Sequence, residues 1–377
     1  MTRASRGPAI GFARALSLII AAVSLLLPHM VSAADIPTFA VEPSWPKQLP
    51  NNWILGQVGG ITVDANGHIW VIHRPRSLTD DEKGAALNPS RSKCCIPAPP
   101  VLEFDTDGNL LRAWGGPGPG YEWVGREHGI EVDDRGFVWI GGNADNDNAI
   151  LKFTLDGTFV AQIGSIAPSK GSNDTTQLGK PAETAIDKDA NEIYVADGYG
   201  NRRVIVFDAT TLAYKRHWGA YGHVPDDTRQ PPYDPKAPVA QQFGNPVHCV
   251  KIADDGLVYV CDRINDRIQV FKKDGTFVTE WFFEKTTLGN GAVWDIAIWP
   301  DQKQTYLLSA DGENNEIRII RRDDGSVVGS FGHNGRNAGQ FHWVHAMAVD
   351  KSGNVYPAEV DTGKRIQKFR LTSDALR

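Results

Sequence analysis

The strongest constraint on the fold is internal repetition. Six stretches share one pattern, in which a short strand, a turn rich in Asp, Asn or Gly, and a second strand follow one another. When they are aligned on the turn, successive stretches lie between 46 and 69 residues apart, and most are followed by two further strands. Units of this length with four short strands are typical of propeller blades. The sequence therefore predicts an all-β fold, a six-bladed β-propeller. The six stretches are 59–72, 128–141, 182–197, 248–262, 294–310 and 345–359.

The last unit ends after its third strand, "RIQKFRL" (365–371). We expect "PTFAVEP" (37–43) to supply the missing fourth strand, because this closes the ring and leaves no open sheet edge. The pattern "VYVCDRINDRIQVFKKDGTF" (258–277) resembles the NHL repeat, and this likeness covers nearly the whole chain after residue 34. Residues 35–377 are therefore predicted to form a single propeller domain of NHL-type repeats.

Residues 1–34 are predicted to be a cleaved signal peptide. Positive charges on Arg3, Arg6 and Arg14 precede or flank the short apolar run 15–27, and small residues follow at 31–34. Loss of the three arginines takes the formal charge from −6 to −9, which argues against a nucleic-acid partner. No later segment is apolar enough to cross a membrane. We expect a periplasmic or secreted monomer without membrane insertion.

The four cysteines would then lie in an oxidising compartment, where disulfides can form. Cys249 and Cys261 stand six residues on either side of Asp255, so a regular hairpin makes them cross-strand neighbours. Cys94 and Cys95 are adjacent in a proline-rich loop. Structural pairs and free thiols both fit this spacing, whereas the absence of a CxxC spacing argues against a cysteine metal site.

Histidine recurs at one position of the repeat. The first strand of each blade lines the central channel, so equivalent positions of different blades face one another. At the position five residues before the turn, blades two, four and six carry His128, His248 and His345. A lone strand histidine is more often a hydrogen-bonded core residue than a ligand, but three in one register suit a metal such as zinc with an open fourth position. The other blades carry Gly59, Ala182 and Trp294 there.

Three more polar side chains stand where second strands end, and are predicted to surround the same point. They are Arg74, Tyr199 and Arg263. Each also has a structural interpretation, as a salt bridge or a packed aromatic. Together with a metal they suit a small anionic substrate whose hydroxyl or carbonyl binds the metal. Arginine and aspartate that recur beside the third strand are instead interpreted as repeat-pattern residues; they are Asp197, Arg203, Asp262, Arg267 and Arg365.

Several motifs together resemble the peptidyl-α-hydroxyglycine α-amidating lyase family, whose members split a C-terminal α-hydroxyglycine into a peptide amide and glyoxylate. They are "LGQVGGITVD", "HRP", "EHGIEVD", "VADGYGNRR", "NPVHC" and "VCDRINDRIQVF". The resemblance implies a zinc-dependent carbon–nitrogen lyase. The family's zinc ligands fall on His128, His248 and His345, and its catalytic residues on Tyr199, Arg74 and Arg263. It also implies that zinc acidifies the substrate hydroxyl, that Tyr199 takes its proton, and that an arginine such as Arg263 holds the carboxylate.

Two departures limit what the resemblance carries over. The family's structural Ca²⁺ uses backbone carbonyls corresponding to Val58 and Ile130 and a carboxylate after the third histidine, where this chain has Ala346, so this ion is in doubt. The family also has a methionine where this chain has Trp343. With the insertions 78–99 and 223–241, this suggests a different substrate, either peptide-like or a small α-hydroxy acid or carbinolamide.

Two other classes of function stay open. One is a propeller hydrolase such as a lactonase, although such enzymes hold calcium with carboxylate and amide groups, which three channel histidines argue against. The other is an NHL propeller that binds proteins on its loops and keeps the metal for structure. Propellers host all three functions, so the fold alone does not decide between them.

Overall fold

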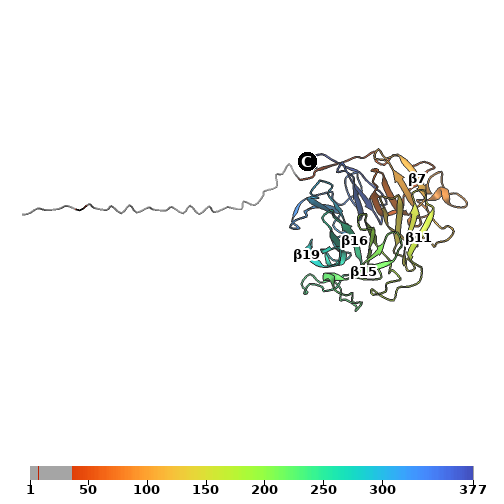
Figure 1. Cartoon of the computed structure of the whole chain (residues 1–377). Coiled ribbons are helices and arrows are strands. Elements are labelled where there is room, and N and C mark those ends of the chain that lie inside the picture. Colours follow the sequence, from red (N-terminus) through yellow and green to blue (C-terminus); the bar gives the residue numbers. More distant parts are fainter. Residues whose placement is uncertain (1–6, 8–35, 377) are drawn as a thin grey trace, which may run out of the picture.

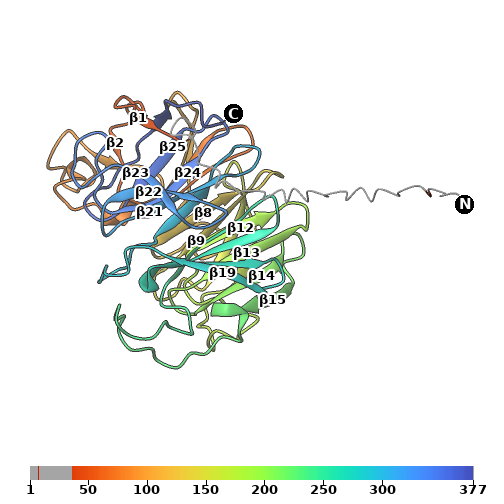
Figure 2. The same cartoon turned by 90° about the vertical axis from the view of Figure 1, so that its left-hand side faces the viewer.

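Figure 1 shows a computed structural model of the 377-residue chain, in which residue 7 and residues 36–376 are described. The predicted signal peptide therefore lies outside the described residues, apart from Gly7. The described chain folds into six four-stranded sheets, each an antiparallel set of neighbouring strands, arranged around a central axis (Figures 1 and 2). The predicted six-bladed β-propeller is confirmed.

The blades follow one another along the chain. Blade one contains β3 (Gln57–Val63), β4 (Ile69–Arg74), β6 (Val101–Phe104) and β7 (Leu110–Trp114). Blade two contains β8 (Glu127–Val132), β9 (Phe137–Gly142), β10 (Ala149–Thr154) and β11 (Phe159–Gly164). Blade three contains β12 (Glu183–Asp187), β13 (Glu192–Asp197), β14 (Arg203–Asp208) and β15 (Tyr214–Trp218). Blade four contains β16 (Val247–Ile252), β17 (Leu257–Asp262), β18 (Arg267–Lys272) and β19 (Phe277–Phe282). Blade five contains β20 (Asp295–Ile298), β21 (Tyr306–Asp311), β22 (Glu316–Arg321) and β23 (Val327–Phe331).

Blade six is built from both ends of the described chain. Its strands are β24 (Val344–Val349), β25 (Val355–Glu359), β26 (Phe369–Leu371) and β1 (Phe39–Val41). β1 pairs antiparallel with β26, with Phe39 opposite Leu371, and the hydroxyls of Thr38 and Thr372 are 2.9 Å apart. The N-terminal strand thus supplies the fourth strand of the last blade and covers its edge.

The first strand of every blade lies innermost. Around the ring β3 contacts β8, β8 contacts β12, and so on through β16, β20 and β24, which contacts β3 again. Because strands alternate in direction, the loops after second strands and the connections between blades lie at one end of the channel, here called the upper face. Both insertions therefore lie on the upper face. The first follows η2 (Pro75–Ser77) and carries η3 (Gly84–Ala86) and β5 (Ile96–Pro97), which pairs with β2 (Trp53–Ile54). The second follows η4 (Ala220–Gly222).

At the opposite end, the tight turns explain the recurring spacing within the repeat. One carboxylate oxygen of Asp64 accepts two turn amides, from Asn66 and His68, and the other accepts the indole N–H of Trp70. Asp133 makes the same three bonds in blade two. The buried tryptophan and the turn therefore fix one another, while six apolar clusters fill the spaces between neighbouring blades.

Buried ion pairs fix the upper ends of the second and third strands. Arg203 Nε donates to Asp197 at 2.9 Å and Arg267 Nε to Asp262 at 2.8 Å, with all four side chains fully buried. Arg365 is similarly paired with Glu359 in blade six. Removing one partner of such a pair leaves a buried charge uncompensated. These arginines stabilise the recurring blade structure, as the sequence predicts.

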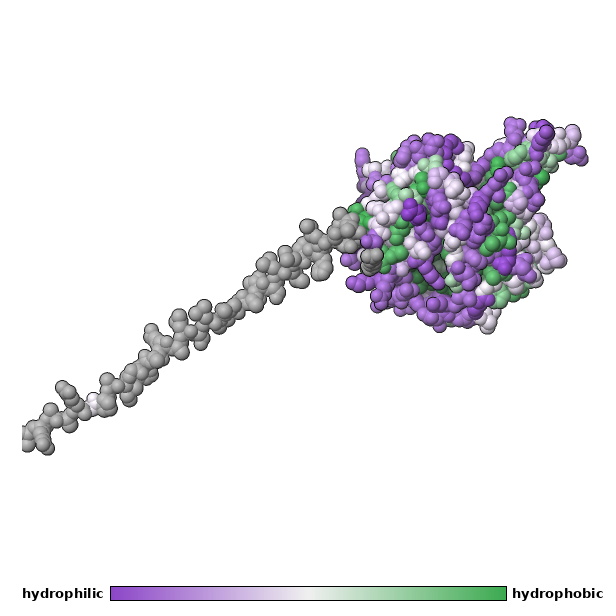
Figure 3. Space-filling model, turned by 90° about the horizontal axis from the view of Figure 1, so that it is seen from above, coloured by the Kyte–Doolittle hydropathy of each residue, from purple (hydrophilic) through white to green (hydrophobic). Residues whose placement is uncertain are grey.

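All four cysteines are in disulfides, Cys249–Cys261 and Cys94–Cys95, and Cys249 faces Cys261 across the β16–β17 ladder. The visible face in Figure 3 is mainly hydrophilic, with apolar residues between polar ones. Within residues 36–376, no helix is both long and apolar enough to cross a membrane.

Candidate metal centre

Each channel histidine lies at a β-bulge. The pairing register shifts between Val247 and Cys249 in β16 and between Val344 and Ala346 in β24, so His248 and His345 are the extra residues. In β8 the register shifts between Glu127 and Ile130, around His128. A bulge bends the strand locally and redirects a side chain. This local irregularity is what turns three strand residues toward the channel axis.

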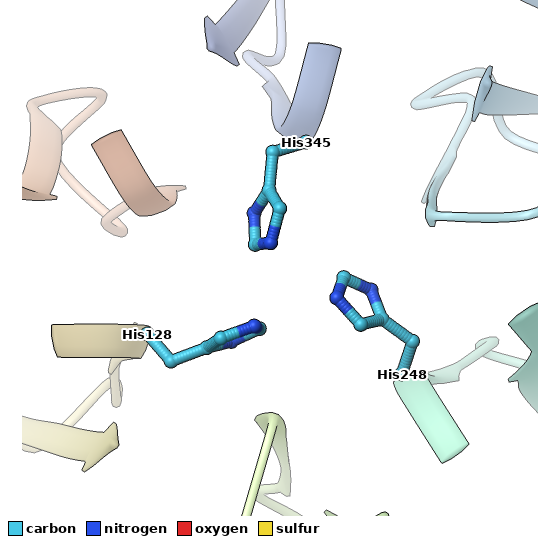
Figure 4. A group of neighbouring side chains, drawn as sticks. All are labelled: His128, His248 and His345. Carbon is cyan, nitrogen blue, oxygen red and sulfur yellow. The ribbon is translucent and has the colours of Figure 1, made fainter. Parts of the chain in front are cut away.

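The three imidazoles converge on one point. Their ring centroids are 4.7, 4.8 and 5.0 Å apart, and one ring nitrogen from each lies within 4.8 Å of the others. Figure 4 shows the rings of His128, His248 and His345 pointing toward one another from three different blades. Only 2–3% of each residue is exposed. The predicted histidines therefore form a buried group that could hold a metal ion.

Backbone carbonyls fix the tautomer of two histidines. His128 Nδ1 lies 2.8 Å from the carbonyl oxygen of Ala182, and His248 Nδ1 bonds the carbonyl of Trp294. A carbonyl can only accept, so in both rings Nδ1 carries the proton and Nε2 has a free lone pair. Among the described residues, His345 Nδ1 has no hydrogen-bond partner. The carbonyl bonds of His128 and His248 are the usual arrangement around metal-binding imidazoles, and His345 lacks such a bond in the described part of the chain.

The surroundings keep the three rings uncharged. Burial lowers the pKa of His128, His248 and His345 well below 6.5, and the positive charges of Arg74 and Arg263 lower it further. Neutral imidazole is the form that ligates a metal. A cluster of buried nitrogen lone pairs directed at one point fits a cation such as zinc, whose protein sites use nitrogen ligands of this kind.

Tyr199 lies directly beside this point. Its hydroxyl is 3.0 Å from Nε2 of both His128 and His248, and a phenol can donate its proton to only one of them. The loop after β13 that carries it is packed closely against β16. A Cβ added at Gly198 would lie 2.0 Å from the carbonyl oxygen of Val247, so only glycine fits there.

Arg263 opens η5 (Arg263–Asn265) and contacts Tyr199 directly. Its Nη1 donates to the Tyr199 oxygen at 3.2 Å, and its guanidinium carbon lies 4.5 Å from the centre of the Trp294 ring. The Nε of Arg263 is buried and has no partner among the described residues. The side chain is thus oriented by stacking and retains unused donor capacity.

Arg74 lies on the other side of the histidines, at the end of β4. Its Nε donates to the backbone carbonyl of Glu127 at 2.7 Å and its Nη1 to Gln57 at 2.8 Å. Burial lowers the pKa of Arg74 to about 10, an effect that nearby Tyr199 partly offsets. The structure therefore brings all six sequence-predicted residues together, with Arg263 in contact with Tyr199 and Arg74 held against the His128 strand.

The sequence indicates a bulky wall at Trp343 but does not predict that Trp294 extends it. The ring of Trp294 lies 5.7 Å from that of His345 and 5.2 Å from that of Trp343, while it also supports Arg263. The signal was available, because Trp294 occupies the same position of the repeat as the three histidines. Its role could not be read from the sequence, since it depends on how the loop after β17 folds over blade five.

Below the histidines, the channel contains a lysine among carboxylates. The ammonium of Lys251 bonds Glu183 and lies 3.6 Å from Asp295, and both carboxylates line a small cavity together with Ala346. Asp295 also accepts the amide of Met347, directly after Ala346. The two carboxylates that line the cavity with residue 346, where the sequence lacks a calcium-binding carboxylate, are therefore paired with a lysine.

Comparison with known proteins places the chain in a family. No family model matches the sequence. Human NHL repeat-containing protein 3 is 30% identical over 285 residues, which cover 72% of each chain. The chain belongs to the NHL repeat-containing proteins. The mouse protein of the same name is 28% identical to this NHL-repeat protein over 354 residues, covering 90% of this chain and 86% of that one.

Other relatives of this NHL-repeat protein include amidating lyases. A probable peptidyl-alpha-hydroxyglycine alpha-amidating lyase of Caenorhabditis elegans is 24% identical over 328 residues, which cover 84% of this chain and 83% of that one. Among solved structures, a streptogramin B lyase aligns with a TM-score of 0.51 and 15% identity over 90% of this chain and all of the other. This structural likeness supports the propeller fold.

Proposed function

We propose that this protein is a metal-dependent carbon–nitrogen lyase that cleaves a carbinolamide, such as an α-hydroxyglycine derivative, into an amide and glyoxylate. The proposal includes removal of residues 1–34 as a signal peptide and action of the single propeller domain, 35–377, in the periplasm or outside the cell. It is supported above all by one observation. The Tyr199 hydroxyl lies within hydrogen-bond distance of two neutral histidines and of Arg263, inside a buried three-histidine group.

The proposed cofactor is zinc, held by His128, His248 and His345. A zinc ion with three nitrogen ligands and an open fourth position supplies Lewis acidity toward an oxygen-bearing substrate. We do not extend the proposal to calcium, because Ala346 offers no ligand and the Lys251 ammonium lies among the nearby carboxylates.

The chain's own residues supply the proton transfer and the binding of charge. Tyr199, as phenolate, takes the proton of the substrate hydroxyl, and the Arg263 guanidinium orients its oxygen through a hydrogen bond of 3.2 Å. As this O–H bond breaks, a carbonyl forms and the C–N bond breaks. The electron pair of the C–N bond remains on the amide nitrogen, which takes up the proton that Tyr199 received, so that Tyr199 returns to its starting form. The unused Nε of Arg263 and the positive charge of Arg74 suit the carboxylate that becomes part of glyoxylate.

The test is release of glyoxylate from α-hydroxyhippuric acid by the purified protein without its signal peptide. We expect turnover, and we expect Tyr199→Phe to lower kcat by about 10²- to 10⁴-fold, the usual contribution of a positioned general base. Tyr214→Phe, a change on the outer strand β15, is the matched control and should retain full activity.

Two results would contradict the proposal. One is no glyoxylate from the metal-loaded protein, which would favour a binding scaffold. The other is a Tyr199→Phe variant as active as the wild type, which would show that another group takes the proton.

A further inference from the structure

The second insertion builds a large pocket on the upper face. In Figure 2 this insertion is the long green loop at the lower edge of the molecule. Residues 229–240 and blade four enclose a cavity of about 480 Å³. This volume is within the range of small-molecule sites, roughly 300–1,000 Å³. None of the proposed chemistry uses it.

The walls of the pocket are mostly apolar. The insertion contributes Pro232, Tyr233, Pro238 and Val239, and blade four contributes Ile264 and Phe282. Tyr233 anchors the loop, since its hydroxyl donates to the backbone carbonyl of Lys285 at 2.8 Å. The burial of apolar groups is thus the main interaction that the pocket can offer a ligand.

One wall of the pocket is the backbone that carries the metal-centre residues. Ile264 and Asn265 line the pocket and directly follow Arg263. Asn245 also lines it, three residues before His248, and its side-chain amide donates at 2.8 Å to the carbonyls of Gly198 and Asn201, on either side of Tyr199. The pocket is therefore next to the reacting groups on the same face.

Cations border this apolar space. Arg202, Arg229 and Lys285 line the pocket, and none of them forms an ion pair with another residue of 36–376 within 4.0 Å. Arg267 also reaches the pocket, but its charge is balanced by Asp262. Asp234 is the single carboxylate in the lining. The excess positive charge suits an anionic group at the edge of a bound apolar ligand.

We propose that this pocket binds the part of the substrate that leaves as the amide, and that this part is a bulky apolar group bearing a negative charge. The orientation of the substrate, with its α-hydroxyglycine end at Tyr199 and Arg263, rests on the proposed function. The volume of the pocket, its apolar walls and its unpaired cations indicate an apolar anionic ligand whether or not the proposed reaction takes place.

The test compares two substrates with the same reacting end, N-acetyl-α-hydroxyglycine and N-(6-sulfo-2-naphthoyl)-α-hydroxyglycine. We expect the wild-type KM to be at least tenfold lower for the naphthoyl compound. Val239→Asp should remove this preference, because it should raise the KM of the naphthoyl compound far more than that of the acetyl compound. Val239 is 40% exposed, so the change is compatible with folding, and Val224→Asp, at a 77% exposed position of the same insertion outside the pocket, is the matched control.

A second measurement needs no turnover. Binding of the apolar anion 8-anilinonaphthalene-1-sulfonate, followed by fluorescence, should weaken at least fivefold in Val239→Asp and in Arg229→Glu but not in Val224→Asp. If the probe binds in this way and neither substrate yields glyoxylate, the pocket stands and the proposed function fails. If both substrates turn over with equal KM and the probe binds all variants alike, the pocket inference is wrong.

Discussion

His73 is a buried histidine that shows how strongly this molecule depends on uncharged imidazoles. It is fully buried, its Nδ1 accepts the amide of Gly56 at 3.0 Å, and its Nε2 lies 3.0 Å from the carbonyl oxygen of Pro99. Burial lowers the pKa of His73 to about 4, against 6.5 for an unperturbed histidine. Protonation would break the first of these bonds and place a charge in the core.

The pH dependence of stability follows from this shift. Between pH 6.5 and 4 the unfolded chain binds the proton and the folded chain does not, so the free energy of unfolding falls as the pH is lowered. For His73 alone the loss is about 3 kcal/mol. Urea unfolding of His73→Gln should show a correspondingly flatter pH profile than the wild type. The exposed His223→Gln serves as the control, and an unchanged slope in His73→Gln would refute the assignment.

For single residues, the sequence predicts those members of the candidate site that occupy a recurring position of the repeat. His128, His248 and His345 could be placed together because one register position recurs in every blade. The sequence predicts that Tyr199 and Arg263 lie near the same point, but it does not predict the hydrogen bond between them. The stacking of Arg263 on Trp294 could not be predicted either, because it depends on how two irregular loops pack, and loops follow no periodic pattern.

At the scale of single elements, the hairpin β16–β17 combines a bulge with a covalent link. Its ladder is regular from Cys249 to Ile252, which places Cys249 opposite Cys261, and irregular only at His248. The regular part was predictable from the spacing about Asp255. The bulge was not, since no residue type in "PVHCV" marks an extra residue. The disulfide ties the strand that bears His248 to the strand that Arg263 directly follows.

The two disulfides should differ greatly in their effect on stability. Cys249 and Cys261 are 12 residues apart, so their link restricts the unfolded chain, and Cys249→Ala/Cys261→Ala should lower the free energy of unfolding by about 3 kcal/mol. Cys94 and Cys95 are adjacent, so Cys94→Ala/Cys95→Ala should cost less than about 1 kcal/mol. Denaturant unfolding of both double variants measures this difference. Equal losses would mean that chain restriction is not what the longer link contributes.

At the scale of the whole molecule, stability depends on closing the ring. Five blades are continuous in sequence, whereas blade six needs β1, which pairs with β26 from the other end of the chain. Phe39 in β1 contacts the rings of Trp299 in blade five and Phe331 in β23, with centroids 6.0 and 4.5 Å apart. The repeat predicts six blades. Because the last unit lacks a fourth strand, the sequence also indicates that residues 37–43 complete it. The path of residues 219–246 had no such guide.

Closure can be tested by weakening β1. Phe39→Ala should lower the free energy of unfolding by about 2 kcal/mol, less than for a fully buried phenylalanine because Phe39 is half-buried. Val327→Ala, at a 51% exposed position of β23, is the control and should change it by less than about 0.5 kcal/mol. If Phe39→Ala is as mild as the control in denaturant unfolding, β1 does not hold the ring closed.

Elemental analysis of the purified protein shows whether three histidines from alternate blades hold one metal ion. We expect about one equivalent of zinc in the wild type, loss of that zinc in His248→Ala, and full retention in His223→Ala at an exposed histidine. Less than about half an equivalent in zinc-supplemented wild type, or a content unchanged by His248→Ala, would contradict this expectation.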